Sequence, residues 1–519
     1  MEMTRREFIM SSAAALAYTA VGGGSKAEAL SPDYWCTWGI QNRLVKKREQ
    51  ANPTLLAGDQ GAYAARNNLT ENLIFDDGGW SKRMGVGFRQ KLFMMLDDGW
   101  DVAFDSLPAK CIERFGALEP YPARFPSMGK TPLERLTAIN DKLKEDGWQG
   151  AALWIASQRE GDRHGKLAPG VEDFYRRRIE LSARAGIRYW KVDWGVRSGN
   201  DFRGMVSHLA KEICPELMVE HCPLLTFPFN AQHFDAGKNV FTGNGRANVD
   251  IDNRDLVERM RFSDVIRTYD VLSPLGSVTT LDRTVDYSRL IDKYGLATIL
   301  NVEDDPVIAA VLGHGLGIMR DIDEAQSYGT MIARAVANWR NFAPVFGGRE
   351  GYATVASERI LSERYRFKEG EVWLRSAWGH EIMQAAPAIV ARGMPLPEVR
   401  ALENDVPYVI AGRHPGGAMS VGTLPRIDAA GKKTTPPVEV VVKMALTKRE
   451  PLAIFGAPRK VIVPVGGKVD ELQVCHLSTG RQARVKPTMA GQCLCLDMAE
   501  LYGALPENKE REIPLMVRY

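Results

Sequence analysis

The sequence predicts an α/β fold, a closed (β/α)8 barrel (TIM barrel) followed by a C-terminal antiparallel β-sandwich. Short apolar segments alternate with amphipathic helical segments from about residue 34 to 345. Such alternation is typical of parallel βαβ units, and eight strands in one unbroken series favour a closed barrel over an open sheet. After about residue 350, short strand-like segments are separated by turns rich in Gly, Pro and Lys, which predicts the sandwich.

Eight short apolar segments are the predicted barrel strands. They cover residues 34–40, 92–97, 150–156, 189–193, 217–220, 265–269, 296–301 and 315–319. Predicted helices cover residues 132–145, 171–185, 202–213, 285–293 and 323–341. C-terminal strands are predicted at residues 371–376, 408–411, 438–445, 460–465 and 473–477. The long segments 41–89 and 101–129 follow strands, so we expect them at the C-terminal face of the barrel.

The first 29 residues are predicted to be a twin-arginine export signal. Arg5 and Arg6 precede an apolar run over residues 9–21, and Ala27-Glu28-Ala29 has the A-x-A form of a cleavage site. A short N-terminal helix is the alternative. The interpretation predicts a bacterial protein exported to the periplasm or beyond. The predicted domains are residues 1–29 for the signal, 30–348 for the barrel and 349–519 for the sandwich.

Composition limits the partners of the chain. Its 519 residues are 45% hydrophobic and 25% charged, and the net charge is only +3. These values are typical of a globular protein and give no reason to expect nucleic acid or a membrane surface as partner. Beyond the N-terminal segment no stretch predicts a membrane span. The seven cysteines include no Cys-x-x-Cys pair, so neither a disulfide framework nor a metal site is predicted; Cys493 and Cys495 are predicted to share one face of a strand.

Charged side chains stand where several predicted barrel strands end. Asp193 ends the fourth strand, and Lys191 lies two residues earlier on the same face. The other strand ends carry Asp97 and Asp98 (second), Glu220 and His221 (fifth), Arg267 and Asp270 (sixth), and Asp304 and Asp305 (seventh). Carboxylates gathered in one barrel mouth repel one another unless a metal, sugar hydroxyls or paired acid–base chemistry uses them.

Three of these motifs, in this order, resemble the α-galactosidase superfamily, glycoside hydrolase families 27 and 36 and their relatives. They are Asp97-Asp98-Gly99-Trp100, Lys191-Val192-Asp193 and Arg267-Thr268-Tyr269-Asp270. The resemblance covers roughly residues 34–345 and implies the same barrel with a C-terminal β-sandwich. The roles that it implies are sugar-hydroxyl contacts for Asp97 and Asp98, a sugar contact for Lys191, the nucleophile for Asp193, and the acid/base for Asp270 with Arg267 beside it.

Retaining glycoside hydrolysis suits these residue types. It needs one ionised and one protonated carboxyl group roughly 5–5.5 Å apart. Lys191 would keep Asp193 ionised, and the neighbouring negative charge would raise the pKa of Asp270. Aromatic side chains beside carboxylates suit sugar stacking, although barrel packing explains most tryptophans equally well. The candidate stacking residues are Trp38, Trp100 and Trp194.

Several positions keep a second interpretation. Asp193 can instead cap the next helix, and Asp97-Asp98 can form a turn. Asp264 is the alternative to Asp270, although its place before the strand favours a surface role. Glu220 and His221 are candidate substrate contacts, and His221 can equally well only pack. Two further interpretations are a loop at Asp304-Asp305 and a structural role for His314.

The first and fifth predicted strands depart from the family patterns, so the sugar stays open. Residues 35–39 read Trp-Cys-Thr-Trp-Gly, where family 27 has Gly-Trp-Asn-Ser-Trp. An α-galactoside is the leading substrate, and N-acetylgalactosaminides, β-L-arabinopyranosides and α-glucosides are alternatives. The other function classes are a metal-dependent barrel hydrolase and a non-catalytic sugar-binding protein of the same fold. The sequence has no Gly-x-Gly-x-x-Gly fingerprint of a nucleotide-binding site, and no cofactor is predicted. The sequence leaves the oligomeric state open.

Overall fold

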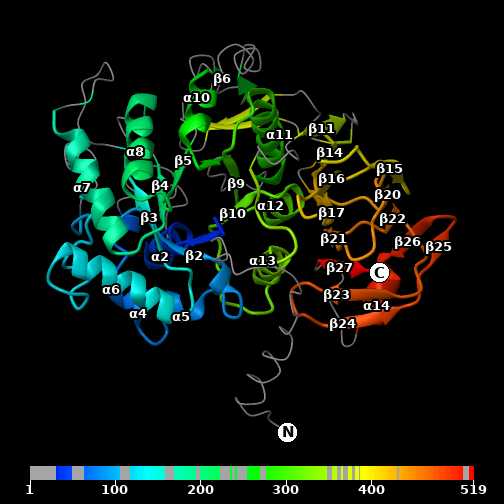
Figure 1. Ribbon diagram of the computed structural model, residues 1–519, viewed down its shortest axis with the longest axis horizontal. Helices are drawn as coiled ribbons and strands as arrows, with labels where there is room; N and C mark the ends of the chain where they lie inside the picture. Colours follow the sequence, from blue (N-terminus) through cyan, green and yellow to red (C-terminus); the bar gives the residue numbers. More distant parts are fainter. Residues whose placement is uncertain are drawn as a thin grey trace, which may run out of the picture.

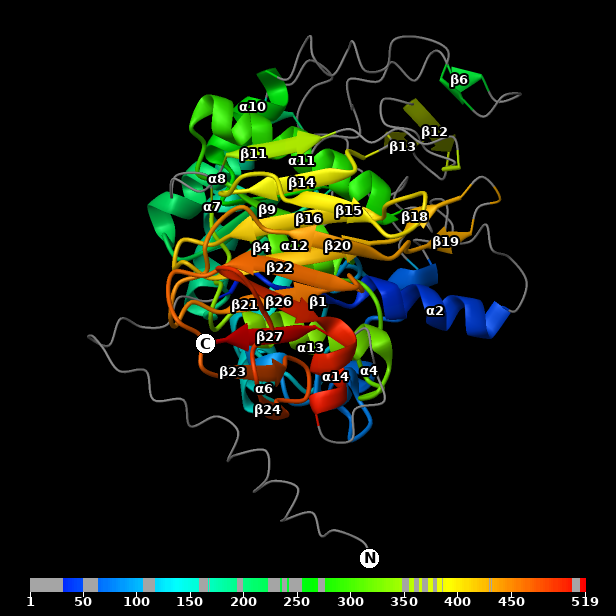
Figure 2. The same ribbon diagram turned by 90° about the vertical axis from the view of Figure 1, so that its right-hand side faces the viewer.

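The computed structural model describes residues 31–49, 64–105, 117–157, 167, 169–193, 199–222, 234–235, 240–241, 254–268, 276–347, 354–358, 364–365, 372–376, 380–384, 386–428, 430, 432–505 and 514–519. They form a barrel of strands and helices with a domain of β-sheets beside it (Figure 1). The sheets of this second domain face the viewer in Figure 2. No helix within these ranges is long and apolar enough to cross a membrane. The predicted export signal lies outside them.

Parallel strands close into an eight-stranded barrel, which confirms the predicted fold class. The strands are β1 (Tyr34–Cys36), β2 (Phe93–Leu96), β3 (Ala151–Ile155), β4 (Tyr189–Val192), β5 (Met218–His221), β8 (Val265–Arg267), β9 (Ile299–Glu303) and β10 (Gly315–Ile318). They follow one another around the barrel in chain order, and β10 pairs with β1 to close it. Each strand overlaps one of the eight predicted segments.

The predicted strand ends are least accurate at β1 and β9. β1 stops at Cys36 because the chain turns and α2 (Trp38–Glu49) begins almost at once. Gly39 makes this turn possible, since a Cβ there would lie 1.7 Å from the carbonyl oxygen of Met319. β9 runs two residues beyond the predicted end at residue 301 and so includes Glu303. The difference brings a further carboxylate into the barrel.

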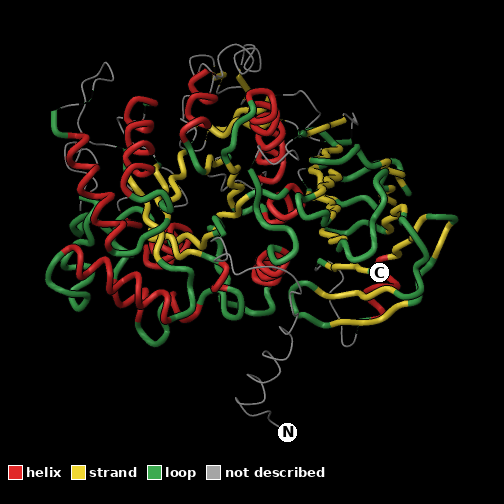
Figure 3. Tube along the Cα trace, in the orientation of Figure 1, coloured by secondary structure: helices red, strands yellow, loops and turns green. Residues whose placement is uncertain are grey.

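The barrel helices form at the predicted segments, outside the strands (Figure 3), although Gly276–Tyr294 begins before the predicted residue 285 and Tyr328–Trp339 is shorter than the predicted 323–341. Thr131 and Glu134 form a reciprocal capping box at the start of α6. The helices of this part are α4 (Glu71–Phe75), α5 (Trp80–Arg83), α6 (Pro132–Glu145), α7 (Val171–Arg184), α8 (Asn200–Ile213), α10 (Arg254–Phe262), α11 (Gly276–Tyr294), α12 (Pro306–Leu312) and α13 (Tyr328–Trp339). A short pair, β6 (Phe234–Asp235) and β7 (Val240–Phe241), lies between β5 and α10 in the chain.

Side chains alternate along the barrel strands between two buried layers. One layer packs strands against helices and includes Trp190 and Val192 of β4. The other fills the barrel interior and includes Tyr34, Trp154 and Tyr189. Because strand side chains alternate, Lys191 shares the inward face of Tyr189. The inward face of β4 therefore carries a cation into the barrel.

The C-terminal domain packs two sheets around a second apolar core, and its sheets are mixed. The larger sheet has the order β11 (Val355–Glu358), β14 (Ile389–Arg392), β16 (Tyr408–Arg413), β17 (Met419–Leu424), β21 (Leu452–Phe455), β27 (Leu515–Arg518), β23 (Leu472–His476) and β24 (Gln482–Val485). The smaller has the order β15 (Glu398–Ala401), β20 (Val438–Val441), β22 (Lys460–Pro464), β26 (Cys493–Asp497) and β25 (Met489–Ala490). Smaller elements are β12 (Val372–Ser376), β13 (His380–Gln384), β18 (Arg426–Ile427), β19 (Lys433–Thr434) and α14 (Met498–Ala504). The pairs β14–β16, β17–β21 and β20–β22 are parallel, unlike the predicted antiparallel pattern.

Both faces of β26 follow the predicted alternation. Cys493 and Cys495 are half-buried on one face, whereas Leu494 and Leu496 are buried on the other. The leucines belong to the core between the sheets. The two cysteines therefore share a face, as predicted, and it is the outer one.

The two domains meet where α12 of the barrel lies on β16 and β17. Ser420 donates to the Val311 carbonyl at 2.9 Å, and Arg392 donates to the Leu312 carbonyl at 2.6 Å. Gly412 lets β16 approach the helix, since a Cβ there would lie 2.0 Å from the Val311 oxygen. Backbone thus packs against backbone at this contact, which leaves no room for a side chain.

Replacing Gly412 with alanine is expected to lower the melting temperature, because the new methyl group must push β16 away from α12. Overpacking of this kind costs about 1–3 kcal/mol. Gly416→Ala is the matched control, since the nearest atom to its added Cβ is the Phe342 oxygen at 3.9 Å. Calorimetry measures both variants, and an equal melting temperature for Gly412→Ala and the natural protein would contradict the proposed close contact.

Candidate active site

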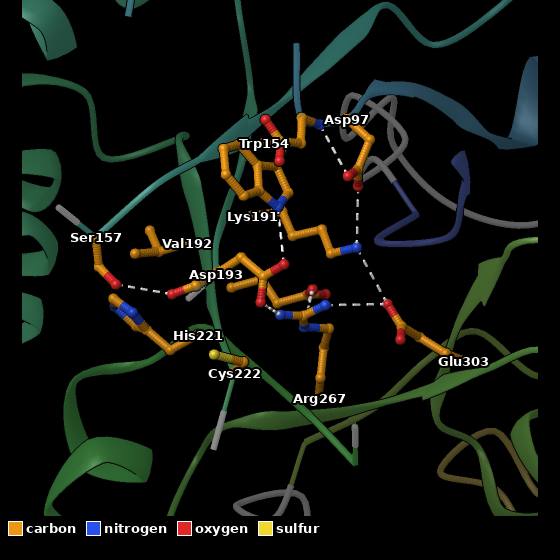
Figure 4. A network of polar contacts seen from close by, with 12 residues as sticks. Asp97, Trp154, Ser157, Lys191, Val192, Asp193, His221, Cys222, Arg267 and Glu303 are labelled. Carbon is orange, nitrogen blue, oxygen red and sulfur yellow. Dashed lines mark hydrogen bonds and ion pairs between the residues drawn. The ribbon is translucent and has the colours of Figure 1, made fainter. Parts of the chain in front are cut away.

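A cluster of charged side chains fills the C-terminal end of the barrel. Figure 4 shows Asp193 at its centre, between Trp154 and Arg267, with Lys191 bridging Asp97 and Glu303. The strands that deliver these residues are β2 for Asp97, β3 for Trp154, β4 for Lys191 and Asp193, β8 for Arg267 and β9 for Glu303. Since parallel strands all end at one rim, residues far apart in sequence meet here.

Asp193 follows β4 directly, and both of its carboxylate oxygens accept hydrogen bonds. The indole Nε1 of Trp154 donates to Oδ2 at 2.8 Å, and Nη2 of Arg267 donates to Oδ1 at 2.6 Å. The side chain keeps 15% of its surface exposed. Helix α8 begins later, with Gly199 at its N-cap position, so Asp193 is not a helix cap. A partly exposed carboxylate held at both oxygens is suited to react with a ligand in the barrel mouth.

The surroundings of Asp193 keep its carboxyl group ionised. Burial by itself raises its pKa. The positive charges of Arg267 and Lys191, with the hydrogen bonds from Trp154 and Arg267, outweigh burial and hold the pKa well below its usual range. The group is therefore an anion at neutral pH, as a carboxylate nucleophile must be.

Arg267 joins Asp193 to two deeper carboxylates. Its Nε lies 3.2 Å from Oε1 of Glu220, and its Nη1 lies 3.3 Å from Oε1 of Glu303. The planar guanidinium group thus hydrogen-bonds to Asp193 and Glu303 and forms an ion pair with Glu220. Burial lowers the pKa of Arg267, but the surrounding carboxylates raise it by more than burial lowers it. The pKa of Arg267 therefore lies above its usual value.

Lys191 is the second buried cation. Its Nζ lies 3.2 Å from Oδ2 of Asp97 and 3.4 Å from Oε1 of Glu303. These anions raise the pKa of Lys191 above its usual value despite burial, which acts in the opposite direction. Glu303 therefore contacts both cations of the cluster. Glu303 was not predicted as a site residue, because the predicted strand ends at residue 301. The alternation of Asn301 and Glu303 along a longer strand is the sequence signal for it.

Glu220 lies below the exposed part of the site. Its Oε2 accepts from the Tyr189 hydroxyl and the Asn301 amide, both at 2.6 Å, and its Oε1 accepts from the Tyr34 hydroxyl at 3.3 Å. The same hydroxyl is nearer to Oε1 of Glu303, at 2.9 Å, so its single proton is shared between the two carboxylates. Burial raises the pKa of Glu220 more than Arg267 lowers it. The structure thus makes Glu220 an anchor of Arg267 rather than a surface open to substrate.

Asp97 and Asp98 lie at the rim of the cluster, and both are buried. Asp97 accepts from Lys191 and from the Cys36 thiol, which is 3.0 Å from its Oδ2. Both oxygens of Asp98 lie 2.8 Å from Nε of Arg66. Burial raises the pKa of Asp98 to about 6, against the opposing effect of Arg66. Both carboxylates thus already have protein partners, which fix their orientation.

The predicted stacking residues occupy different surroundings. Trp100 is fully buried and donates to the Trp154 carbonyl at 2.8 Å, so it supports Trp154 instead of offering a face to a sugar. Trp38 is half-buried at the start of α2 and packs against the barrel interior. Trp194 lies outside the described residues, as does Asp270, the predicted acid/base.

His221 does not join the cluster. It is the last residue of β5 and points outward, where Nε2 lies 2.8 Å from the Ser207 hydroxyl of α8. Side-chain alternation explains this, because Glu220 occupies the inward position. A substrate in the barrel mouth would not reach this ring, so the structure favours the packing interpretation of His221 over substrate contact.

Other open positions have structural partners. Asp264 accepts from the Val219 amide at 2.9 Å and precedes β8, so it lies at the opposite end of the strand from Arg267. Asp304 accepts from the Met319 amide at 2.9 Å, and Asp305 caps α12. His314 is buried, with Nδ1 3.2 Å from Arg392. Among the residues that the structure describes, no three His, Cys, Asp or Glu side chains are arranged to hold a metal ion.

No protein-family model matches the chain, and none of the curated proteins matches it in sequence. Among solved structures, a family 27 β-L-arabinopyranosidase from Geobacillus stearothermophilus is 11% identical, with a TM-score of 0.39 over 95% of this chain and 97% of that one. An α-amylase from Geobacillus thermoleovorans, complexed with acarbose, is 8% identical, with a TM-score of 0.40 over 87% and 96%. An α-amylase from Malbranchea cinnamomea is 9% identical, with a TM-score of 0.38 over 84% and 86%. At these TM-scores the likenesses do not bear on activity, so the functional proposal depends on the site itself.

Proposed function

We propose that the protein is a retaining exo-glycosidase of α-galactosidase-like type, with Asp193 as nucleophile and Asp270 as acid/base. One observation carries the proposal: Asp193 is an ionised, partly exposed carboxylate at the C-terminal end of a barrel strand, fixed by Arg267 and Trp154. The assignment of Asp270 depends on the sequence motif Arg267-Thr268-Tyr269-Asp270, in which Asp270 follows Arg267 by three residues.

The proposed reaction is a double displacement. A carboxylate oxygen of Asp193 forms a bond to the anomeric carbon while the glycosidic bond breaks and Asp270 protonates the departing oxygen. Asp270, now ionised, then takes a proton from water, whose oxygen attacks the anomeric carbon and releases Asp193. Arg267 remains beside Glu220 and Glu303 throughout. Its charge is therefore still compensated in the intermediate, when Asp193 has no negative charge.

Sugar recognition is proposed for the residues at the rim of the cluster. Lys191 and Asp97 form a donor and acceptor pair 3.2 Å apart, and Asp98 lies next to Asp97. Sugar hydroxyls are proposed to share this donor and this acceptor, which in the structure are paired with each other. Trp38, which is half-buried, is the proposed stacking surface, and Trp194 keeps that role as a proposal from the sequence.

An α-galactoside is the proposed substrate, on the basis of the three sequence motifs. The protein is expected to hydrolyse one member of a panel of nitrophenyl glycosides: α-galactoside, α-N-acetylgalactosaminide, β-L-arabinopyranoside and α-glucoside. The released sugar is expected to keep its anomeric configuration, which proton NMR of the first product detects. Inversion would contradict the double displacement.

Asp193→Asn is expected to reduce kcat on the best substrate on the order of 10³-fold or more, because the amide cannot form the glycosyl ester. Asp270→Asn is expected to reduce kcat strongly as well, and least for substrates with good leaving groups. Asp264→Asn is the matched control and is expected to retain activity, since Asp264 lies before β8, at the far end of the barrel.

The same assay separates the alternative functions. Full activity of Asp193→Asn would contradict the nucleophile assignment. Activity of the natural protein that a chelator abolishes would favour a metal-dependent hydrolase. Sugar binding without turnover of any glycoside would favour a non-catalytic sugar-binding protein.

Arg267→Lys is expected to move the acidic limb of the kcat/KM profile to higher pH. Arg267 favours the ionised form of Asp193, so a less well placed cation raises the pKa of that carboxyl group. Fewer molecules then carry ionised Asp193 at a given acidic pH. A shift of roughly one pH unit is expected, since an adjacent cation lowers a carboxyl pKa by about 1–3. Arg392→Lys, in the domain contact, is the control; an unmoved limb in Arg267→Lys would contradict the role of Arg267.

We also propose that the protein is exported, which would place its substrate outside the cytoplasm. Arg5→Lys combined with Arg6→Lys is expected to hold the protein in the cytoplasm with residues 1–29 attached. The natural protein is expected in the periplasm or medium, beginning at Leu30. Cell fractionation and mass spectrometry measure both, and equal export of the variant would contradict the twin-arginine route.

A further inference from the structure

A second buried arginine holds the backbone of Asp193 from outside the barrel. Arg203 lies on α8 and is fully buried. Its Nη1 donates to the Val192 carbonyl at 2.8 Å, and its Nη2 donates to the Asp193 carbonyl. The Ser157 hydroxyl donates to the same Asp193 carbonyl at 2.9 Å, and the Asp193 amide donates to the Ile155 carbonyl at 2.9 Å. The main chain of Asp193 is thus hydrogen-bonded on both sides.

His221 holds this arginine in place. Its Nδ1 lies 3.2 Å from Nη1 of Arg203, and because a guanidinium group only donates, Nδ1 must accept. The proton of the neutral ring is then on Nε2, which can donate to the Ser207 hydroxyl at 2.8 Å. Burial, followed by the charges of Arg203, Arg259 and Arg267, holds the pKa of His221 well below its usual range. The ring therefore remains a neutral acceptor.

The arrangement indicates positioning rather than simple packing. A buried guanidinium group is costly, and well-packed apolar side chains in place of buried charged groups often stabilise a protein. Here the guanidinium group binds the last two carbonyls of the β4 segment, those of Val192 and Asp193. A displacement of about 1 Å at a reacting group can reduce a rate on the order of 10²-fold. Fixing this main chain therefore bears directly on where the carboxylate lies.

We propose that Arg203 is a positioning residue for the nucleophile and that His221 is a positioning residue that acts through Arg203. The proposal rests on the proposed function, in which Asp193 is the nucleophile. It gives His221 a role that is neither substrate contact nor mere filling of space. Figure 4 shows His221 and Ser157 on the side of Asp193 away from Glu303, so the two supports reach Asp193 from different directions.

The first experiment compares four variants on the best glycoside. Arg203→Met and His221→Leu remove the donor and the acceptor, whereas Arg203→Lys and His221→Asn keep a cation and an acceptor. We expect kcat to fall about 100-fold in Arg203→Met and about tenfold in His221→Leu, with KM changed less than about threefold. The conservative variants are expected to recover part of kcat. If Arg203→Met does not fold, the kcat values of Arg203→Lys and His221→Leu still test the proposal.

The chain offers a matched control pair. Arg392 and His314 are also buried, with Nη1 3.2 Å from Nδ1, and the arginine likewise donates to a backbone carbonyl, that of Leu312. His314 directly precedes β10 and Arg392 is the last residue of β14, so the pair lies in the domain contact and not at the C-terminal rim of the barrel. Arg392→Met and His314→Leu are expected to lower the melting temperature without lowering kcat. A loss of kcat in these controls equal to that in Arg203→Met would overturn the proposal.

A second measurement does not depend on turnover. The Trp154 indole donates to Oδ2 of Asp193, so its NMR signal, assigned with Trp154→Phe, reports the position of that carboxylate. The signal is expected to shift in Arg203→Met and His221→Leu and to stay in place in the control pair. If the natural protein hydrolyses no glycoside, the proposed function fails, yet this signal still tests the positioning. An unmoved signal in the Arg203 and His221 variants would overturn it.

Discussion

The ion pair between Arg267 and Asp193 is the interaction on which the rest of the site depends. Arg267 also contacts Glu220 and Glu303, and the two carboxyl groups that it touches most directly respond differently. The pKa of Asp193 is lowered, because Lys191 and the Trp154 hydrogen bond add to the effect of Arg267. The pKa of Glu220 is raised, because burial there is complete and Glu303 adds negative charge. Arg267 thus keeps the partly exposed Asp193 carboxylate ionised and is itself held in place by the more deeply buried Glu220.

The fold could be predicted from the sequence because hydrophobic periodicity is a local property. Each of the eight barrel strands lies at one of the predicted segments, and α6 begins and ends at the predicted residues 132–145. The first strand was predicted too long, since the contact of Gly39 with Met319 joins residues that are far apart in the chain. The parallel pairs of the C-terminal sheets likewise depend on which strands meet, which local patterns do not specify.

The candidate site could be predicted only in part. The strand ends identified Asp97, Lys191 and Arg267, which the structure brings together around Asp193. Ending β9 at residue 301 hid Glu303, since an error of two residues removed the final inward position of that strand. Trp154 was missed for another reason. It looks like an ordinary core residue of β3, and only the pairing of β3 with β4 brings its indole to Asp193.

Neighbouring residues of one strand support Asp193 from opposite sides. On β5, Glu220 points inward and contacts Arg267, which binds the carboxylate of Asp193. The next residue, His221, points outward and contacts Arg203, which binds the carbonyl of Asp193. Because side chains alternate along a strand, the two supports come from different layers. The barrel interior keeps the Asp193 carboxylate ionised, and the helix layer fixes the position of the Asp193 main chain. Neither support lies in a loop, since Glu220 and His221 belong to β5, Arg267 ends β8 and Arg203 lies on α8, so the position of the carboxylate is fixed by the elements of the barrel itself.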